Sequence, residues 1–361
     1  MLNHPKSRLV LIAFAGLSLF AGLWAGTVRL GWDLPVPMRL LPSFHGPLMV
    51  VGFLGTLIGL ERAAAMGRAW PYGVPLFTAA GVLSLLAGFP FQVGAALVTM
   101  GSLFLVAVFV SLYRRSPTAH FITMTLSGTA WVAGNCLWLA GSPLYSAAPW
   151  WAGFLVLAIA GERLEIARIV RPSWKARVLF HLNVAVVLSG LGFSLFEFHP
   201  GVRIAGVGLA ALAIWLLRYD IARLTVRDDG LSRYMAICLL SGYCWLVAGG
   251  VMWLFFALQF QAVPGYDAML HVIFLGFVFS MIFGHAPVIF PSIVGIALPF
   301  SHLFYLHLLL LHASLLLRVG GDLTLSAAVQ RWGGLLGVLA VMLFLISNLR
   351  AAIIGARNRQ P

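Results

Sequence analysis

Charged residues are scarce in this sequence. They make up 9% of its 361 residues, whereas hydrophobic residues make up 61%. Soluble globular proteins contain roughly 25% charged and 45–50% apolar residues, so the composition excludes an ordinary soluble domain. The charges that are present are mostly basic, with a formal net charge of +13. They lie in the gaps between apolar blocks, where basic residues contact anionic lipid head groups. This distribution argues against nucleic acid as a partner and favours a lipid bilayer.

Cysteine is also rare. The three cysteines are Cys136, Cys238 and Cys244, and all lie inside apolar blocks. None has the C-x-x-C spacing of a zinc or redox site or the C-x-x-C-H spacing of covalent haem attachment, so a c-type haem is excluded. The sequence also lacks a Walker loop, a dinucleotide fingerprint, a G-x-S-x-G elbow and an H-E-x-x-H motif. No signature of a soluble enzyme class is present.

Long apolar blocks are what the sequence does contain. Residues 9–28, 93–113 and 234–258 are nearly uncharged, and each is about as long as a helix that crosses a hydrocarbon core of about 30 Å. A membrane β-barrel would alternate apolar and polar residues over segments of about ten, and this alternation is missing. We therefore predict an all-α membrane protein with about twelve transmembrane helices. The predicted spans are 9–28, 45–61, 73–91, 93–113, 119–140, 147–162, 178–196, 201–217, 234–258, 268–290, 301–317 and 332–349.

The basic residues predict the orientation of these helices. With the N-terminus in the cytoplasm, eighteen of the 23 lysines and arginines fall in cytoplasmic segments, as the positive-inside rule requires. The first apolar block lacks a small-residue cleavage site, so we expect a retained helix and not a signal peptide. Both termini are predicted to be cytoplasmic, in a multi-pass protein of the cytoplasmic (inner) membrane. Residues 218–233 are predicted to be a polar cytoplasmic loop.

The spans also suggest an internal repeat of four helices within a single polytopic domain, residues 1–361. Residues 126–131 and 240–245 share the pattern Leu-Ser-Gly-x-x-Trp. Three repeats, at residues 1–115, 116–230 and 231–361, would surround a pseudo-threefold axis. The alternative is chance recurrence, because small residues are common wherever membrane helices pack closely.

Histidines stand out among the polar residues, because ionisable groups inside a membrane are costly and mark function by default. His45 opens the second predicted helix and His271 lies near the start of the tenth. Both helices run inward, so we expect the two rings at similar depth near the outer face, where imidazoles can serve as axial ligands of haem iron. Asp267 lies one helical turn before His271 and can orient its ring. Alternatively, each histidine bonds only to a carbonyl group or water at the membrane surface.

Four further histidines are candidate metal ligands. His285 lies on nearly the same helix face as His271 but roughly 21 Å further along the axis, so the two cannot bind one ion. The eleventh predicted helix carries His302, His307 and His312, whose spacing of five residues turns neighbouring rings by about 140°. At most one or two of them can join ligands from another helix. A run of histidines within the membrane can instead relay protons.

Two carboxylates at the inner ends of predicted helices complete the set of candidates. Glu61 precedes Arg62, and Glu162 precedes Arg163. Such a pair is usually a local ion pair among the lipid head groups. The functional alternative is a proton entrance, or a carboxylate beside an inner metal site.

With these features in place, the chain resembles the NnrS family of bacterial membrane proteins. The resemblance rests on His45 ahead of Gly52-Phe53, on Leu270-His271 and on Gly284-His285. It implies twelve helices, bound haem and copper, and a role in nitric oxide and nitrosative stress. On this basis we expect a haem b held by His45 and His271, a second metal near His285, and electron transfer with a redox partner protein or nitric oxide handling.

A more distant resemblance is to the catalytic subunit of haem-copper oxidases, which also has haem ligands at the outer ends of helices two and ten. The oxygen-reducing copper site of that family cannot be built from the histidines present here. Two other classes stay open: a cofactor-free transporter or channel that uses histidines and glutamates to bind substrate or protons, and a membrane partner that anchors or matures another redox complex.

Overall fold

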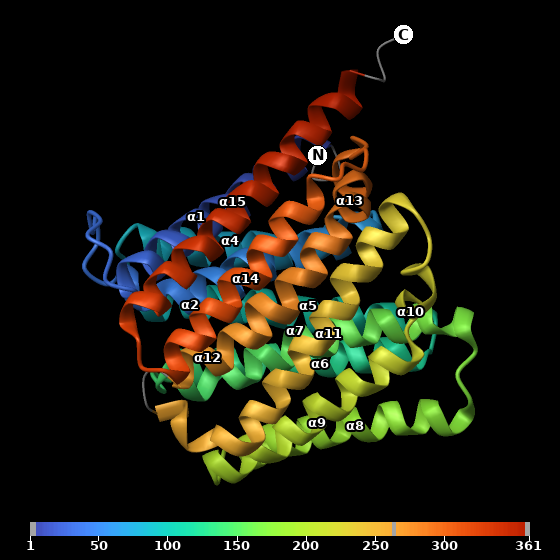
Figure 1. Ribbon diagram of the computed structural model, residues 1–361, viewed down its shortest axis with the longest axis horizontal. Coiled ribbons are helices and arrows are strands. Elements are labelled where there is room, and N and C mark those ends of the chain that lie inside the picture. Colours follow the sequence, from blue (N-terminus) through green and yellow to red (C-terminus); the bar gives the residue numbers. More distant parts are fainter. Residues whose placement is uncertain (1–4, 262–264, 358–361) are drawn as a thin grey trace. The chain divides into compact units, whose positions relative to one another are not determined.

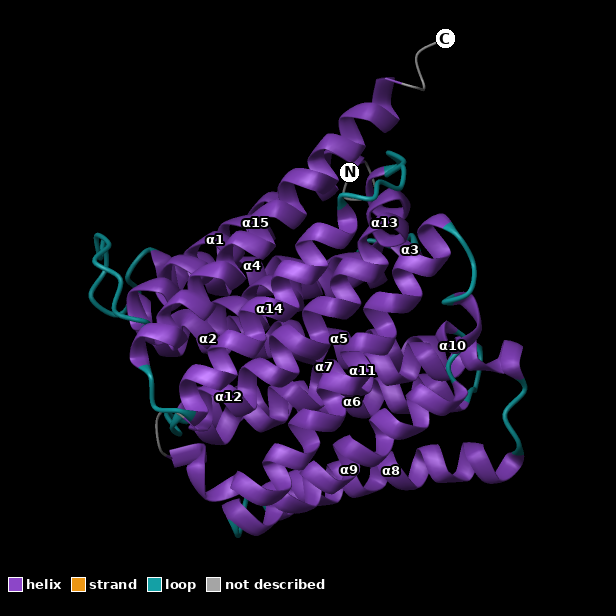
Figure 2. Cartoon of the chain, in the orientation of Figure 1, coloured by secondary structure: helices purple, strands orange, loops and turns teal. Residues whose placement is uncertain are grey.

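The protein is helical throughout the part of the chain that the structure describes. The computed structural model describes residues 5–261 and 265–357, and within these ranges it contains helices joined by turns and loops, without a strand. Figure 2 shows helices and loops alone. The all-α prediction is confirmed.

The chain divides into two compact units. The first unit comprises residues 1–154 and 292–295, and the second comprises residues 155–291 and 296–361. The division at residues 154–155 falls within one helix and coincides with neither predicted repeat boundary. The three-repeat arrangement stays a prediction.

The described residues of the first unit form five long helical stretches and the beginning of a sixth. Its elements are α1 (Pro5–Arg29), η1 (Leu41–Phe44), α2 (His45–Pro47), η2 (Leu48–Leu54), α3 (Gly55–Met66), η3 (Trp70–Tyr72), α4 (Gly73–Leu86), α5 (Phe91–Arg115), α6 (Ala119–Leu139) and the first part of α7 (Leu144–Ile166).

The second unit contains the remaining elements. These are the end of α7, then η4 (Ala167–Val170), α8 (Trp174–Phe193), α9 (Phe198–Tyr219), α10 (Ala222–Thr225), α11 (Gly230–Phe256), η5 (Ala257–Gln261), α12 (Gly265–His271), η6 (Val272–Phe279), α13 (Ser280–Val294, of which residues 292–294 cluster with the first unit), α14 (Phe304–Leu323) and α15 (Ala327–Arg357).

Ten helical stretches among the described residues are long and apolar enough to cross a membrane. Each overlaps one predicted span, although the stretches that end at Val170, Leu323 and Arg357 extend six to eight residues beyond the predicted ends at 162, 317 and 349. The two other predicted spans, 73–91 and 119–140, are helices α4 and α6, and neither is among the ten. These helices indicate a multi-pass membrane protein in a lipid bilayer. The count of twelve spans stays a prediction.

Helix boundaries follow local chemistry. Pro90 precedes the first residue of α5 with an extended backbone (ψ 137°), as expected because proline is tolerated at a helix start and not in its interior. Ser173 caps α8, and its hydroxyl oxygen accepts a hydrogen bond from the Ala176 backbone N–H at 3.3 Å, which satisfies one of the unpaired donors of the first turn.

Small residues let the helices of the second unit approach closely. α8 and α9 lie side by side (Figure 1), and a Cβ atom added to Gly190 of α8 would collide with the backbone of Ala205 in α9. Close backbone approach over small residues is the usual packing mode of membrane helices. Large aromatic side chains fill the remaining core, including Trp215 and Trp253.

Candidate functional site

His45 lies against helix α1 in the first unit. Its Nδ1 atom is 2.7 Å from the backbone oxygen of Gly22, and a Cβ atom added to Gly26 would fall 2.7 Å from the ring. A carbonyl oxygen can only accept, so Nδ1–H donates and the neutral ring carries its lone pair on Nε2. This is the tautomer that presents Nε2 to a metal ion.

A π-helical segment, η2, follows His45 almost directly. It spans Leu48–Leu54 and contains the Gly52-Phe53 pair. The hydroxyl of Ser18 in α1 donates to the backbone oxygen of Leu48 at 2.7 Å, which adds a partner for a carbonyl at the start of the irregular segment. π-helical turns inside α-helices are rare and are found frequently at functional sites.

His271, in the second unit, has the same tautomer as His45. Its Nδ1 atom is 2.8 Å from the backbone oxygen of Asp267 and 3.3 Å from the carboxylate Oδ1 of the same residue. Nδ1–H is therefore again the donor, and the lone pair lies on Nε2. Asp267 contacts the ring, as the sequence predicts for a residue that orients it.

The helix of His271 also continues as a π-helix. Segment η6 spans Val272–Phe279 and contains the Gly276-Phe277 pair, and the Ser280 hydroxyl donates to the Gly276 backbone oxygen at 2.7 Å. His45 and His271, in separate units, thus share four local features: the tautomer, the following π-segment, its Gly-Phe pair and a serine bonded to a carbonyl of that segment.

Asp267 is held in turn by Arg318 of α14. The guanidinium Nε donates to Oδ2 at 2.6 Å and Nη2 donates to Oδ1 at 2.9 Å, a two-point geometry that fixes the carboxylate plane. Arg318 is only 8% exposed. The sequence did not point to this arginine as a partner, because fifty-one residues separate it from Asp267.

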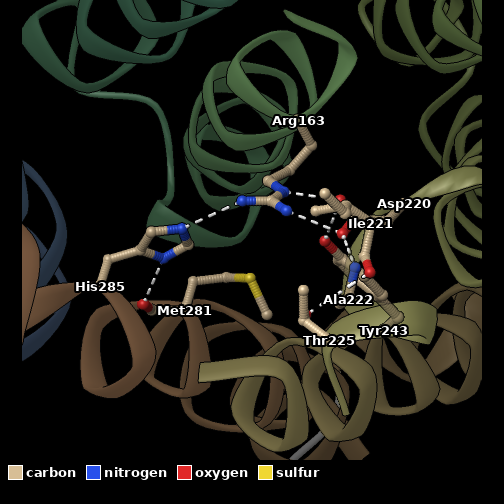
Figure 3. Close-up of polar contacts among 8 residues, drawn as sticks. All are labelled: Arg163, Asp220, Ile221, Ala222, Thr225, Tyr243, Met281 and His285. Atoms are coloured by element: carbon tan, nitrogen blue, oxygen red, sulfur yellow. Dashed lines mark hydrogen bonds and ion pairs between the residues drawn. The ribbon is translucent and has the colours of Figure 1, made fainter. Parts of the chain in front are cut away.

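A second buried polar cluster surrounds Arg163 of α7 (Figure 3). Its Nε and Nη2 donate to the two carboxylate oxygens of Asp220 at 2.6 and 2.7 Å. Arg163 is 4% exposed and Asp220 is 1% exposed. The hydroxyl of Tyr243 donates to Asp220 at 3.0 Å, and the backbone N–H of Ala222 donates to it at 2.7 Å.

His285 borders this cluster. Its Nδ1–H donates to the Met281 backbone oxygen at 2.7 Å, and its Nε2 atom accepts from Nη1 of Arg163 at 3.4 Å (Figure 3). The ring nitrogen that would bind a metal ion therefore faces a guanidinium cation. This arrangement links His285 to an ion pair of α7 and the α9–α10 junction.

The sequence does not predict the buried position of Asp220. A polar cytoplasmic loop is predicted over residues 218–233, whereas the structure forms parts of α9, α10 and α11 in this range and buries Asp220. The reason is that Asp220 follows directly on α9 and turns inward to neutralise Arg163, and the segment after it forms the short helix α10. A signal existed: a buried arginine needs a carboxylate, and acidic residues are few in this chain.

The three histidines that the sequence places on the eleventh predicted helix have different environments. His302 is exposed and lies in the turn before α14, not in the helix. His307 is fully buried, with Nε2 2.9 Å from the Tyr234 hydroxyl, and no described residue bonds its Nδ1. His312 accepts from the Trp245 indole at Nδ1 and bonds the Ser241 hydroxyl through Nε2, both at 3.0 Å, so both of its ring nitrogens have protein partners.

The two glutamates lie in different units. Glu61 accepts from Nη2 of Arg62 at 3.2 Å, the local ion pair expected from the sequence. Glu162 lies in α7 beside Arg163, whose two-point ion pair is with Asp220. Within residues 5–261 and 265–357, no group of three or more histidine, cysteine or carboxylate side chains is arranged to hold a metal ion.

Comparison with known proteins places the chain in a family. No curated protein matches it. No solved structure matches it either. A family model described as a domain of unknown function (DUF8744) matches residues 8–353. Because this match covers nearly the whole sequence, the chain belongs to that family.

Proposed function

We propose that this protein is a haem-binding membrane protein of the NnrS type, with His45 and His271 as axial ligands of a haem b. Its role would be electron transfer or the handling of nitric oxide, with a redox protein as partner and a copper or other metal ion as a second cofactor. A haem held by both histidines would supply one-electron chemistry, and a gas could bind its iron only after one histidine had left.

The observation that carries this proposal is the shared tautomer of the two histidines. A histidine that ligates a metal ion through Nε2 usually donates its other N–H to a carbonyl or carboxylate, which fixes the ring. Nδ1 of His45 donates to Gly22, and Nδ1 of His271 donates to Asp267. The π-segments that follow both residues are further support, because such segments concentrate at functional sites.

The test is the haem and iron content of purified protein and of single variants. We expect His45→Ala and His271→Ala to lose haem while the protein stays folded. His199→Ala is the matched control, since His199 also donates from Nδ1 to a backbone oxygen, that of Ala257 at 3.1 Å, and should retain haem. Equal haem loss in all three variants, or haem retention in all three, would contradict the ligand assignment.

The membrane arrangement belongs to the same proposal. Twelve spans with both termini in the cytoplasm are supported by the distribution of basic residues and by a helix at each predicted span. The cytoplasmic membrane of a bacterium is the location that the NnrS resemblance implies. Three four-helix repeats are supported by the matching features that follow His45 and His271.

A second candidate, a transporter or channel without a cofactor, is favoured by one observation. The Arg163–Asp220 pair is buried among apolar helices beside His285, and intramembrane charges often mark substrate or proton pathways. This reading expects colourless, metal-free protein. In proteoliposomes it expects ion or proton flux that Asp220→Asn abolishes.

A further inference from the structure

The second unit contains a carboxylate without a hydrogen-bond donor. Asp322, near the end of α14, is 4% exposed, and neither of its carboxylate oxygens has a hydrogen-bond partner among the described residues. An ionised carboxylate accepts several hydrogen bonds in almost every buried setting. A buried carboxylate with none therefore needs another explanation.

The neighbours of Asp322 do not neutralise it. Asp322 lies four residues after Arg318 on α14, and residues with this spacing share a helix face. The guanidinium of Arg318 is already bonded at two points to Asp267. The side chains that act on Asp322 are Asp267 of α12, Arg318 of its own helix and Gln330 of α15. The Gln330 amide favours the ionised form of Asp322 but is uncharged, so it cannot compensate the charge of the carboxylate. Two carboxylates thus flank one arginine.

His271 does not supply the missing positive charge. Its Nδ1–H points to Asp267, and a neutral ring satisfies that bond. With both aspartates ionised, the group of Asp267, Arg318 and Asp322 would carry one uncompensated negative charge at the end of a membrane-spanning helix. Buried charge without a partner is strongly unfavourable. A metal cation is disfavoured as the occupant, because the described residues provide no group of three suitable ligands.

We propose that Asp322 carries a bound proton, which it donates in a hydrogen bond to the carboxylate of Asp267. The proton removes the excess charge and provides the one donor that two facing carboxylates lack. Asp267, Arg318 and Asp322 then form an electrically neutral proton-binding site. The assignment goes beyond the proposed function and does not depend on bound haem.

Infrared spectroscopy of the full-length protein at neutral pH tests this proposal. A protonated carboxyl group has a C=O stretching band that ionised carboxylates lack. We expect such a band in the wild-type protein, its loss in Asp322→Asn, and its retention in the control Asp228→Asn, which changes an exposed aspartate. Asp322→Asn should also have the same unfolding temperature as the wild-type protein, because the asparagine amide donates a hydrogen bond to Asp267, as the protonated carboxyl group does, and carries no charge.

Three outcomes would overturn the proposal. The first is a wild-type spectrum without a protonated carboxyl band. The second is a band that Asp322→Asn leaves unchanged. The third is a wild-type protein that lacks the band and is stabilised by added sodium ions, which would make a metal cation the occupant. Should Asp322→Asn fail to fold, Asp322→Glu keeps the carboxyl group and is expected to show a shifted band.

Discussion

At the residue scale, Arg163 of the second unit is a buried cation that requires an ion-pair partner. It is almost completely buried, and its charge is matched at two points by Asp220. Removing one partner of such a pair leaves an unpaired buried charge, whereas replacing both with apolar side chains of similar size is often tolerated. The stability of the protein therefore depends on keeping or replacing Arg163 and Asp220 together, more than on either residue alone.

We predict that Arg163→Met lowers the free energy of unfolding by about 3–5 kcal/mol. The double variant Arg163→Met/Asp220→Leu should recover much of that loss. The control is Arg168→Ala, which removes the exposed pair of Arg168 and Glu165 at 3.0 Å and should cost less than about 1 kcal/mol. The measurement is chemical unfolding in detergent. A double variant that is no more stable than Arg163→Met would show that the pair is not the cause.

Single residues also show which parts of the candidate sites the sequence can predict. The sequence predicts the contact of Asp267 with His271 because the two lie one turn apart, and a local relation of this kind follows from helix geometry alone. It does not predict the roles of Arg318 and Asp220, whose partners lie on other helices, or of Asp322, which has no hydrogen-bond partner among the described residues. Such tertiary pairings leave no periodic signal in the sequence.

At the element scale, length and apolar composition predict where helices lie but not where they end. A helix overlaps each predicted span, since about 20 apolar residues are long enough to cross a bilayer. The π-segments η2 and η6 could not be predicted, because a wider turn changes the hydrogen-bond register and leaves composition unchanged. They depend on packing and on bonds such as that from Ser18 to Leu48.

The contact of α8 with α9 allows a matched pair of substitutions. A Cβ atom at Gly190 would meet the α9 backbone, whereas one at Gly192 would meet nothing within 4 Å. We predict that Gly190→Ala destabilises the protein by about 1–3 kcal/mol through overpacking. Gly192→Ala should be neutral or up to about 1 kcal/mol stabilising, because alanine is the better helix former. Thermal unfolding in detergent measures both, and equal effects would argue against close α8–α9 packing.

At the scale of the whole molecule, the separation of basic from apolar residues predicts the topology. The ten apolar helices support a multi-pass membrane protein, and the basic residues favour cytoplasmic termini. We predict that a reporter active only in the cytoplasm is active when fused to either end of the chain. Activity at one end alone would require an odd number of spans and would contradict the twelve-span arrangement.

The central claim is that the protein binds haem through histidines, and the absorption spectrum of the purified, full-length protein tests it most directly. The account predicts a coloured protein with bound iron, whose oxidised and reduced spectra are those of a low-spin b-type haem with two histidine ligands. Folded protein that is colourless and free of iron, even after expression with added haem, would contradict the account.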